Sequence, residues 1–232
     1  MLTLWRDRGD GTRVRVRVTE RLDGDASDPS TLSAERARWT LPRQVHGNEV
    51  VSVSAPGEGA GREADALMTD VEDAVLAIRT ADCVPIALYS SHGVAAVHAG
   101  WRGLEEGVIQ RAHEVLAAAG GGPQWAIVGP HIRPAAYEFG DADLARLVDR
   151  FGPRVRSRTS EGAPALDLTA AVRTVFGECG IDLDHDVGAC TSGDRWFSHR
   201  TRGDTGRLAM LVDMPASHGR EATSRGATGS TT

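Results

Sequence analysis

The sequence predicts a single domain of the α/β or α+β class. Its 232 residues exceed one small domain and fall short of two full ones, so one domain with a complete core is expected. Compact apolar runs of strand length lie close together in the middle of the chain, and segments with helical spacing follow them. Neither a repeat of fixed period nor an internal linker divides the chain.

The strand signals begin near the N-terminus. The segment Arg13–Val18, RVRVRV, alternates with period two and predicts a strand with one solvated face. A turn-rich segment follows, and then a short Ala/Arg/Glu stretch at Ser33–Arg38. Further strands are predicted, in chain order, at Val45–Ser54, Ala74–Arg79, Val84–Tyr89, Gly93–His98, Trp125–Pro130 and Arg207–Val212.

Three helices are predicted between these strands. The first runs from Leu104 to Ala119 and ends at a run of three glycines. The second contains Leu144–Phe151, and either Asp141 or Asp143 is expected to cap it. The third covers Leu168–Cys179, with apolar residues at helical spacing.

Composition excludes several classes of protein. The formal net charge of −6, without a clustered basic face, argues against nucleic-acid binding. An apolar run near the roughly 20 residues that span a bilayer is absent, and the first ten residues lack the order of a secretory signal, so we expect a cytoplasmic protein without membrane contact. Three cysteines without a C-x-x-C pair fit a reducing compartment. We expect a folded domain over residues 1–214, a disordered tail over 215–232, and a monomer or small homo-oligomer.

Three side chains of metal-ligand type stand at the ends of predicted strands. His46 and His98 each lie beside glycine-rich turns, and Cys83 precedes the apolar run VPIALY. Each histidine alone fits a buried core residue equally well, and a lone cysteine is usually a small apolar residue. Two imidazoles and a thiolate together suit zinc and leave a fourth position open. Their wide separation along the chain predicts a catalytic rather than a structural site.

Several motifs follow one another from Gln44 to Val212: QVHG from Gln44, ADALMT from Ala64, TADCVPI from Thr80, VHAGWRG from Val97, a GPxI segment followed by Tyr137-Glu138, and FSHRTRGDTGR from Phe197. Together they resemble the motifs of the multicopper polyphenol oxidase (laccase-domain) family. That family is better described by purine nucleoside phosphorylase and adenosine deaminase activities. The resemblance implies a single layered domain with mixed β-sheets flanked by helices, and a metal held by His46, Cys83 and His98.

The implied chemistry is zinc-dependent. Substrates would be adenosine, inosine or methylthioadenosine together with phosphate, and a metal-activated water would serve deamination. Arg102, beside two glycines at a predicted helix start, is a candidate phosphate ligand; a surface ion pair is its alternative. Arg200 and Arg202 are rival phosphate ligands, and His199 is a candidate proton donor to the leaving base.

Two aspartates flank the proposed metal ligands. Asp65 and Asp82 are both candidates to orient a ligating histidine or to move the proton of the attacking water. Asp65 is favoured, because a strand residue next to Cys83 ordinarily points to the opposite face, and Asp82 would need an irregular backbone to reach the same site.

The chain departs from the family pattern at two places. The region before Gln44 is shorter than usual, and the segment at Arg21, a possible substrate-binding residue, matches the family's Arg-x-Gly-Gly-x-Ser only loosely. His131 stands where the family usually has a cysteine or glycine. It is expected either to face the pocket and alter substrate preference or to lie in a surface turn.

Two other functions remain open at this stage. Eight histidines without a His-x-His pair argue against a multicopper cluster, although copper can outcompete zinc at a two-histidine, one-thiolate site in vitro and give weak oxidase activity. A non-catalytic protein that docks on a partner is the other alternative.

Overall fold

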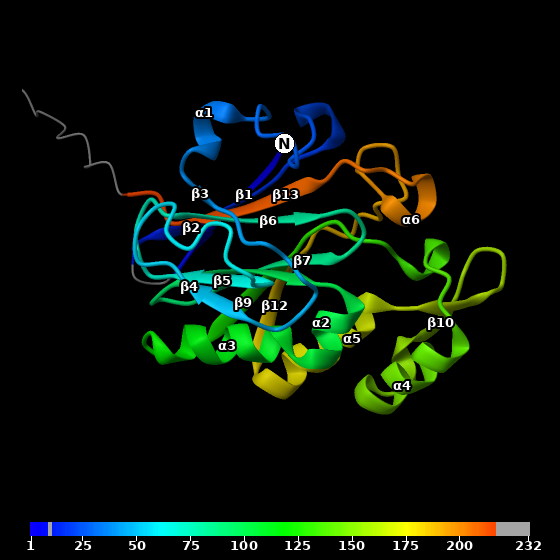
Figure 1. The fold of residues 1–232 in the computed structure, drawn as a ribbon. Coiled ribbons are helices and arrows are strands. Elements are labelled where there is room, and N and C mark those ends of the chain that lie inside the picture. The colour runs from blue at the N-terminus through cyan, green and yellow to red at the C-terminus, as the bar shows by residue number, and fades with distance from the viewer. Residues whose placement is uncertain (9–10, 217–232) are drawn as a thin grey trace, which may run out of the picture.

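Two mixed β-sheets stacked on each other form the centre of the computed structural model, which describes residues 1–8 and 11–216 (Figure 1). The five-stranded sheet has the order β1-β2-β13-β6-β3, and the six-stranded sheet has the order β12-β9-β7-β8-β5-β4. The strands of the five-stranded sheet are β1 (Leu2–Asp7), β2 (Arg13–Val18), β13 (Leu208–Asp213), β6 (Val75–Thr80) and β3 (Trp39–Thr40). Those of the second sheet are β12 (Ile181–Asp186), β9 (Gln124–Val128), β7 (Val84–Tyr89), β8 (Val94–Ala99), β5 (Ala66–Thr69) and β4 (Val50–Ser52).

Helices cover the outer face of the six-stranded sheet, so both of its faces are buried (Figure 1). This explains why β7 and β8 are continuous apolar runs in the sequence rather than alternating ones. The outer face of the five-stranded sheet packs under an N-terminal segment that includes Ala26 and Trp39. The helices are α1 (Ser33–Arg36), α2 (Trp101–Glu106), α3 (Val108–Ala118), α4 (Asp141–Phe151), α5 (Leu168–Cys179) and α6 (His199–Arg202), and a small hairpin joins β10 (Arg156–Arg158) to β11 (Pro164–Leu166).

The predicted layered α/β class is confirmed, and the helices agree with prediction to different degrees. α5 has the predicted bounds, and the Asp167 side chain caps it by accepting the N–H of Ala170. The first predicted helix is instead two helices, α2 and α3, because Gly107 adopts φ 86° and breaks the chain direction. α4 begins at Asp141, and its cap is Gly140, so the prediction of an aspartate cap was wrong.

Two strand predictions also need correction. The segment Val45–Ser54 is mostly loop, and only Val50–Ser52 pairs as a strand. On β2 the arginine face is not fully solvated: Arg17 is 7 % exposed, because β2 lies between β1 and β13 and Asp213 of β13 pairs with both Arg15 and Arg17. Strand β1 had no counterpart among the predictions.

The predicted disordered tail lies almost wholly outside the described residues, which end at Ala216. Within the described ranges we find no helix that is both long enough and apolar enough to cross a bilayer.

Candidate metal centre and cavity

Three side chains from separate elements meet at one edge of the six-stranded sheet. His98 is near the end of β8, Cys83 directly precedes β7, and His46 lies in the loop before β4. One ligand atom from each lies within 4.8 Å of the other two. The Cys83 Sγ atom is 3.9 Å from His46 Nε2, and the two imidazole rings are 4.9 Å apart with nearly perpendicular planes.

This arrangement fits a tetrahedral metal ion. Zinc bonds of about 2.3 Å to sulfur and about 2.0–2.1 Å to nitrogen place the two donor atoms about 3.6 Å apart, close to the sulfur–nitrogen distance above. His98 is buried, Cys83 is partly exposed and His46 is exposed, so the three donors approach from the protein interior and leave one side accessible. The donor set suits zinc, and it also suits copper.

The buried carboxylate of Asp65 orients both histidines. One of its oxygens is 2.7 Å from His98 Nδ1, which turns the His98 Nε2 atom toward Cys83. The other oxygen accepts the N–H groups of Val45 and Gly47, at 3.0 and 2.8 Å, and so fixes the turn in which His46 has φ 63°. Of the two roles expected for Asp65, orienting a ligating histidine and moving the proton of the attacking water, these contacts favour the first.

Electrostatics within the group favour a thiolate. Desolvation opposes ionisation of the Cys83 thiol, but the His98 and His46 imidazoles outweigh it and lower the thiol pKa to about 6. Desolvation likewise disfavours a charged His98, yet the Cys83 thiolate and Asp65 raise its pKa to about 9. The metal-free site is thus a thiolate–imidazolium pair at neutral pH, and metal binding would displace the imidazolium proton.

A glycine makes room for this group. A Cβ atom at Gly100, between β8 and α2, would lie 2.9 Å from a ring carbon of His46 and 3.1 Å from Cys83 Sγ. Gly100 has φ −74°, so the requirement is for space and not for an unusual backbone conformation.

The three donors form part of the wall of a cavity of about 490 Å³. This volume is in the range of small-molecule sites. The buried Tyr137 also lines it, and Arg200 stacks on the Tyr137 ring at 4.7 Å. The remaining lining residues are Ser27, Gln44, Arg79, Thr80, Ala81, Asp82, His199, Thr205 and Arg207.

Asp82 holds the segment that carries α6 against the cavity. Its backbone has φ 97°, the irregular conformation that its entry into the site requires. Its carboxylate accepts the hydroxyls of Thr191 and Ser198, at 2.6 and 2.7 Å, and the backbone N–H of Arg200 at 2.7 Å. His199 and Arg200 thereby reach the cavity wall, as far as 118 positions along the chain from Asp82.

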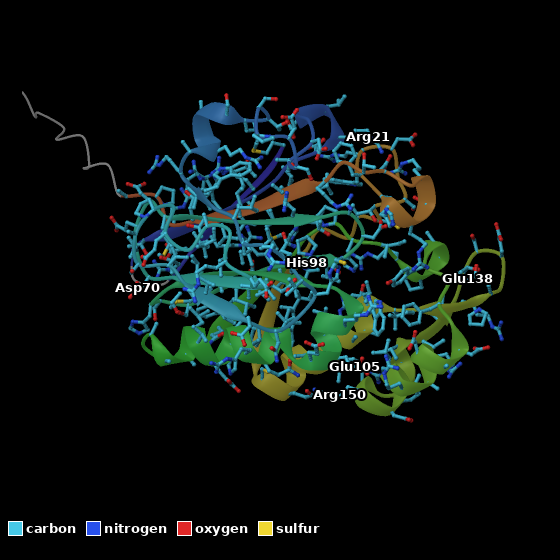
Figure 2. The ribbon with its side chains drawn as sticks, viewed as in Figure 1. Arg21, Asp70, His98, Glu105, Glu138 and Arg150 are labelled. Carbon is cyan, nitrogen blue, oxygen red and sulfur yellow. The ribbon has the colours of Figure 1, made fainter. Side chains whose placement is uncertain are left out.

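Other predicted substrate residues lie away from the cavity wall. The Arg102 guanidinium stacks on Trp101 at 4.4 Å. Arg21 pairs with Asp204 after α6 and stacks on Phe197 before it, so it holds the segments on both sides of that helix (Figure 2). In the same view Arg21 lies near the upper edge of the molecule and the buried His98 near the middle. Arg202, the rival phosphate ligand, donates to backbone carbonyls of the loop before α6, among them that of Ser192.

His131 fits neither of its two predicted positions. It is fully buried, its Nδ1 atom is 2.9 Å from the Gly129 carbonyl, and its Nε2 atom is 2.9 Å from the Thr169 hydroxyl. Burial and the nearby Arg133 guanidinium lower its pKa to about 4, so it is a neutral imidazole that joins the segment after β9 to the start of α5. The surface-turn interpretation was wrong, and His131 is not among the residues that line the cavity.

Sequence reasoning gave no role to Gln44, Arg79 or Arg207, all of which line the cavity. Gln44 could have been found, because it opens the QVHG motif. Arg79 was hidden as the last residue of an apolar run, and Arg207 as the first residue of another.

The sequence of this chain is similar to a known protein family and to named relatives. Residues 26–215 match the family model described as multi-copper polyphenol oxidoreductase laccase. A Mycobacterium bovis protein named purine nucleoside phosphorylase is 35% identical over 241 aligned positions, covering 89% of this chain and 96% of the relative. A Deinococcus radiodurans protein of the same name is 32% identical, covering 88% and 85%.

Solved structures share the fold. A Neisseria meningitidis protein superposes with a TM-score of 0.76 at 26% identity, covering 92% of this chain and 99% of its own. YlmD from Geobacillus stearothermophilus superposes with a TM-score of 0.74 at 25% identity, covering 92% and 100%.

Proposed function

The chain belongs to the multi-copper polyphenol oxidoreductase laccase family, and from that premise and the geometry of the cavity we propose that it is a zinc-dependent purine nucleoside phosphorylase that also deaminates adenosine. The observation that carries the proposal is the convergence of His46, Cys83 and His98 in the wall of a cavity of nucleoside size. The relatives named purine nucleoside phosphorylase support the reaction class.

In phosphorolysis, an oxygen of phosphate forms a bond to C1′ of the ribose while the bond from C1′ to the purine nitrogen breaks. The purine leaves with the bonding electron pair and takes up a proton, and ribose 1-phosphate is the second product. His199, exposed in the cavity wall at the start of α6, is the proposed donor of that proton. Arg200 on the same helix supplies positive charge toward the phosphate.

In deamination, water adds to the adenine carbon that carries the amino group, and ammonia leaves. When bound, zinc supplies a Lewis acid at the accessible side of the donor group. Asp65 keeps His98 in the tautomer whose Nε2 lone pair faces that position, with the Nδ1 proton donated to the carboxylate. Tyr137, with the Arg200 guanidinium on its ring, contributes to the part of the wall against which a purine can pack.

The test is metal analysis of the purified protein, followed by incubation with adenosine with and without phosphate. We expect about one zinc per chain, phosphate-dependent adenine, and inosine without phosphate. Cys83→Ala should lose the metal and both products. Cys179→Ala, at a half-buried cysteine on α5 outside the cavity, is the matched control and should keep them.

Three results separate this function from its alternatives. Adenosine that survives in both reactions with a zinc-loaded protein rejects the enzyme and favours a protein that acts by docking on a partner. Several copper ions per chain with phenol oxidation would favour a laccase. Adenine without inosine would restrict the proposal to phosphorolysis.

A further inference from the structure

Besides the metal donors, the lining of the cavity includes a group of residues that is rich in arginine. Arg79, one of them, is next to last in β6, and it is the only residue of that strand that is not buried. Its neighbours Ile78 and Leu76 contribute to the core between the sheets. Arg79 therefore faces the opposite side, under the N-terminal segment that contains Ser27.

Gln44 fixes the position of Arg79. The Gln44 side-chain amide donates to the Arg79 carbonyl and accepts the Arg79 N–H, both at 2.8 Å. This paired contact uses only the backbone of Arg79 and leaves the guanidinium available to the cavity. It also joins the loop that carries His46 to the strand that carries Arg79, so the position of the metal donor and that of the arginine are coupled.

The charge around Arg79 is not balanced. Arg36 donates to the carbonyls of Ala26 and Asp28, and Arg207 donates to the carbonyls of residues 204–206, so both cations have neutral partners there. Together with burial, these two guanidiniums lower the pKa of Arg79. Among the described side chains, Asp28 offsets part of the Arg36 charge, and Asp25 opposes the effect of both arginines on Arg79. The Oδ1 atom of Asp25 is engaged by the backbone N–H groups of Ser27 and Arg207.

Within the described residues, the Arg79 guanidinium has no hydrogen bond or ion pair. Among the described side chains, three arginines against two aspartates leave an excess of positive charge beside a cavity that can hold a ligand. A guanidinium without a partner in such a place favours a tetrahedral oxyanion, which its fork can bind through two N–H groups.

We propose that Arg79, with Arg207 and the hydroxyls of Ser27 and Thr205, forms the phosphate subsite of this cavity. The inference rests on the proposed function and deepens it by assigning the phosphate a place. The candidate phosphate ligands predicted from the sequence were Arg102, Arg200 and Arg202, and Arg79 was not among them. The ligand is a phosphate dianion. It is either free phosphate, as the second substrate, or the 5′-phosphate of a purine nucleotide, and the two sources are separable by experiment.

The first measurement is calorimetric titration of inorganic phosphate into the zinc-loaded protein and its Arg79→Met variant. Loss of a charge-assisted fork should weaken phosphate binding about ten- to a hundredfold, and Arg79→Lys should fall between the two. Adenosine binding should change less than about twofold. Arg111→Met, which removes an exposed arginine of α3, is the matched control and should leave both affinities unchanged.

Competition with nucleotides identifies the source of the phosphate. If free phosphate occupies the subsite, it binds together with adenosine, adenosine 5′-monophosphate binds no tighter than adenosine, and Arg79→Met raises the KM for phosphate. If the subsite takes a 5′-phosphate, the nucleotide binds tighter than adenosine, and inorganic phosphate competes with it. If Arg79→Met binds inorganic phosphate as tightly as the unchanged protein does, and also binds the nucleotide as tightly, the proposed subsite is wrong.

Binding and turnover measurements distinguish failure of the phosphate subsite from failure of the proposed function. Metal content and thermal unfolding of each variant show whether it is folded and loaded, and direct binding needs no turnover. Phosphate binding that depends on Arg79 in a protein without phosphorolysis would refute the function and keep the subsite. Phosphorolysis in a protein whose binding of both inorganic phosphate and nucleotide is unchanged by Arg79→Met would keep the function and refute the subsite.

Discussion

Replacing Asp65 by asparagine tests how the metal site is held. The two backbone N–H groups of Val45 and Gly47 both point at one carboxylate oxygen, so the asparagine carbonyl must take that place. Its NH₂ group then faces His98 Nδ1, which the carboxylate contacts at 2.7 Å. Nδ1 must become an acceptor, and the proton moves to Nε2, the atom that faces the metal position.

The expected cost follows from this exchange of tautomer. Loss of a carboxylate partner behind a ligating histidine weakens metal binding about 10- to 100-fold, or about 1.4–2.7 kcal/mol. The stability of the fold should fall less, because the amide still accepts the two backbone bonds. Asp65→Ala should differ: it leaves the buried His98 donor without a partner, at about 1–3 kcal/mol, and frees the part-buried N–H groups of Val45 and Gly47, so it should lower the free energy of unfolding as well.

The assay is zinc affinity by competition with a chromophoric chelator, together with thermal unfolding of the metal-free proteins. Asp213→Asn is the matched control, since Asp213 is 1% exposed and pairs with Arg15 within the five-stranded sheet, whereas Asp65 lies next to β5 of the six-stranded sheet. It should lose stability without changing zinc affinity. An Asp65→Asn protein with unchanged zinc affinity would show that this carboxylate does not set the His98 tautomer.

Three further predictions follow from the same contacts. Gly100→Ala should weaken zinc binding about tenfold or more with little effect on unfolding, because its new methyl group enters the donor cluster; equal affinity by chelator competition would contradict this. Asp82→Ala should abolish nucleoside turnover but retain zinc, because it releases α6. Asp82→Asn should keep partial activity, because its amide can accept the Arg200 N–H and donate to the hydroxyls of Thr191 and Ser198. Turnover and metal content are measured for both variants, and an alanine variant with full turnover would refute the role of Asp82. Zinc binding should release about one proton at pH 7.5, because Cys83 is then ionised and His98 protonated, and the number should rise below pH 6 and fall above pH 9. Calorimetry in buffers of different ionisation enthalpy measures this, and a release independent of pH would contradict the pKa values of about 6 and 9.

The sequence predicted those parts of the fold whose signals are local. α5 carries an apolar period, a capping aspartate and a terminal glycine, and its bounds were predicted fully. The break at Gly107 was missed because the apolar period continues through it, and only the positive φ separates α2 from α3. The loop at His46 looked like a strand because its residues alternate, yet Asp65 bonds its backbone into a turn.

The candidate site was predictable only where residue type alone is informative. Histidine and cysteine at strand ends pointed to a metal, and those three side chains do converge. Arginines carry no such signal: Arg102 seemed well placed in the sequence but stacks on Trp101, whereas Arg79 ended an apolar strand and faces the cavity. Which arginine reaches the cavity depends on sheet register and on the segment packed above it, and neither is local.

X-ray absorption at the metal edge of the purified protein tests the central claim most directly. The account predicts zinc at about one ion per chain, with one sulfur at about 2.3 Å and two imidazole nitrogens at about 2.0–2.1 Å, and loss of the sulfur shell in Cys83→Ala. A stoichiometric zinc shell without sulfur, or a sulfur shell that survives Cys83→Ala, would contradict it.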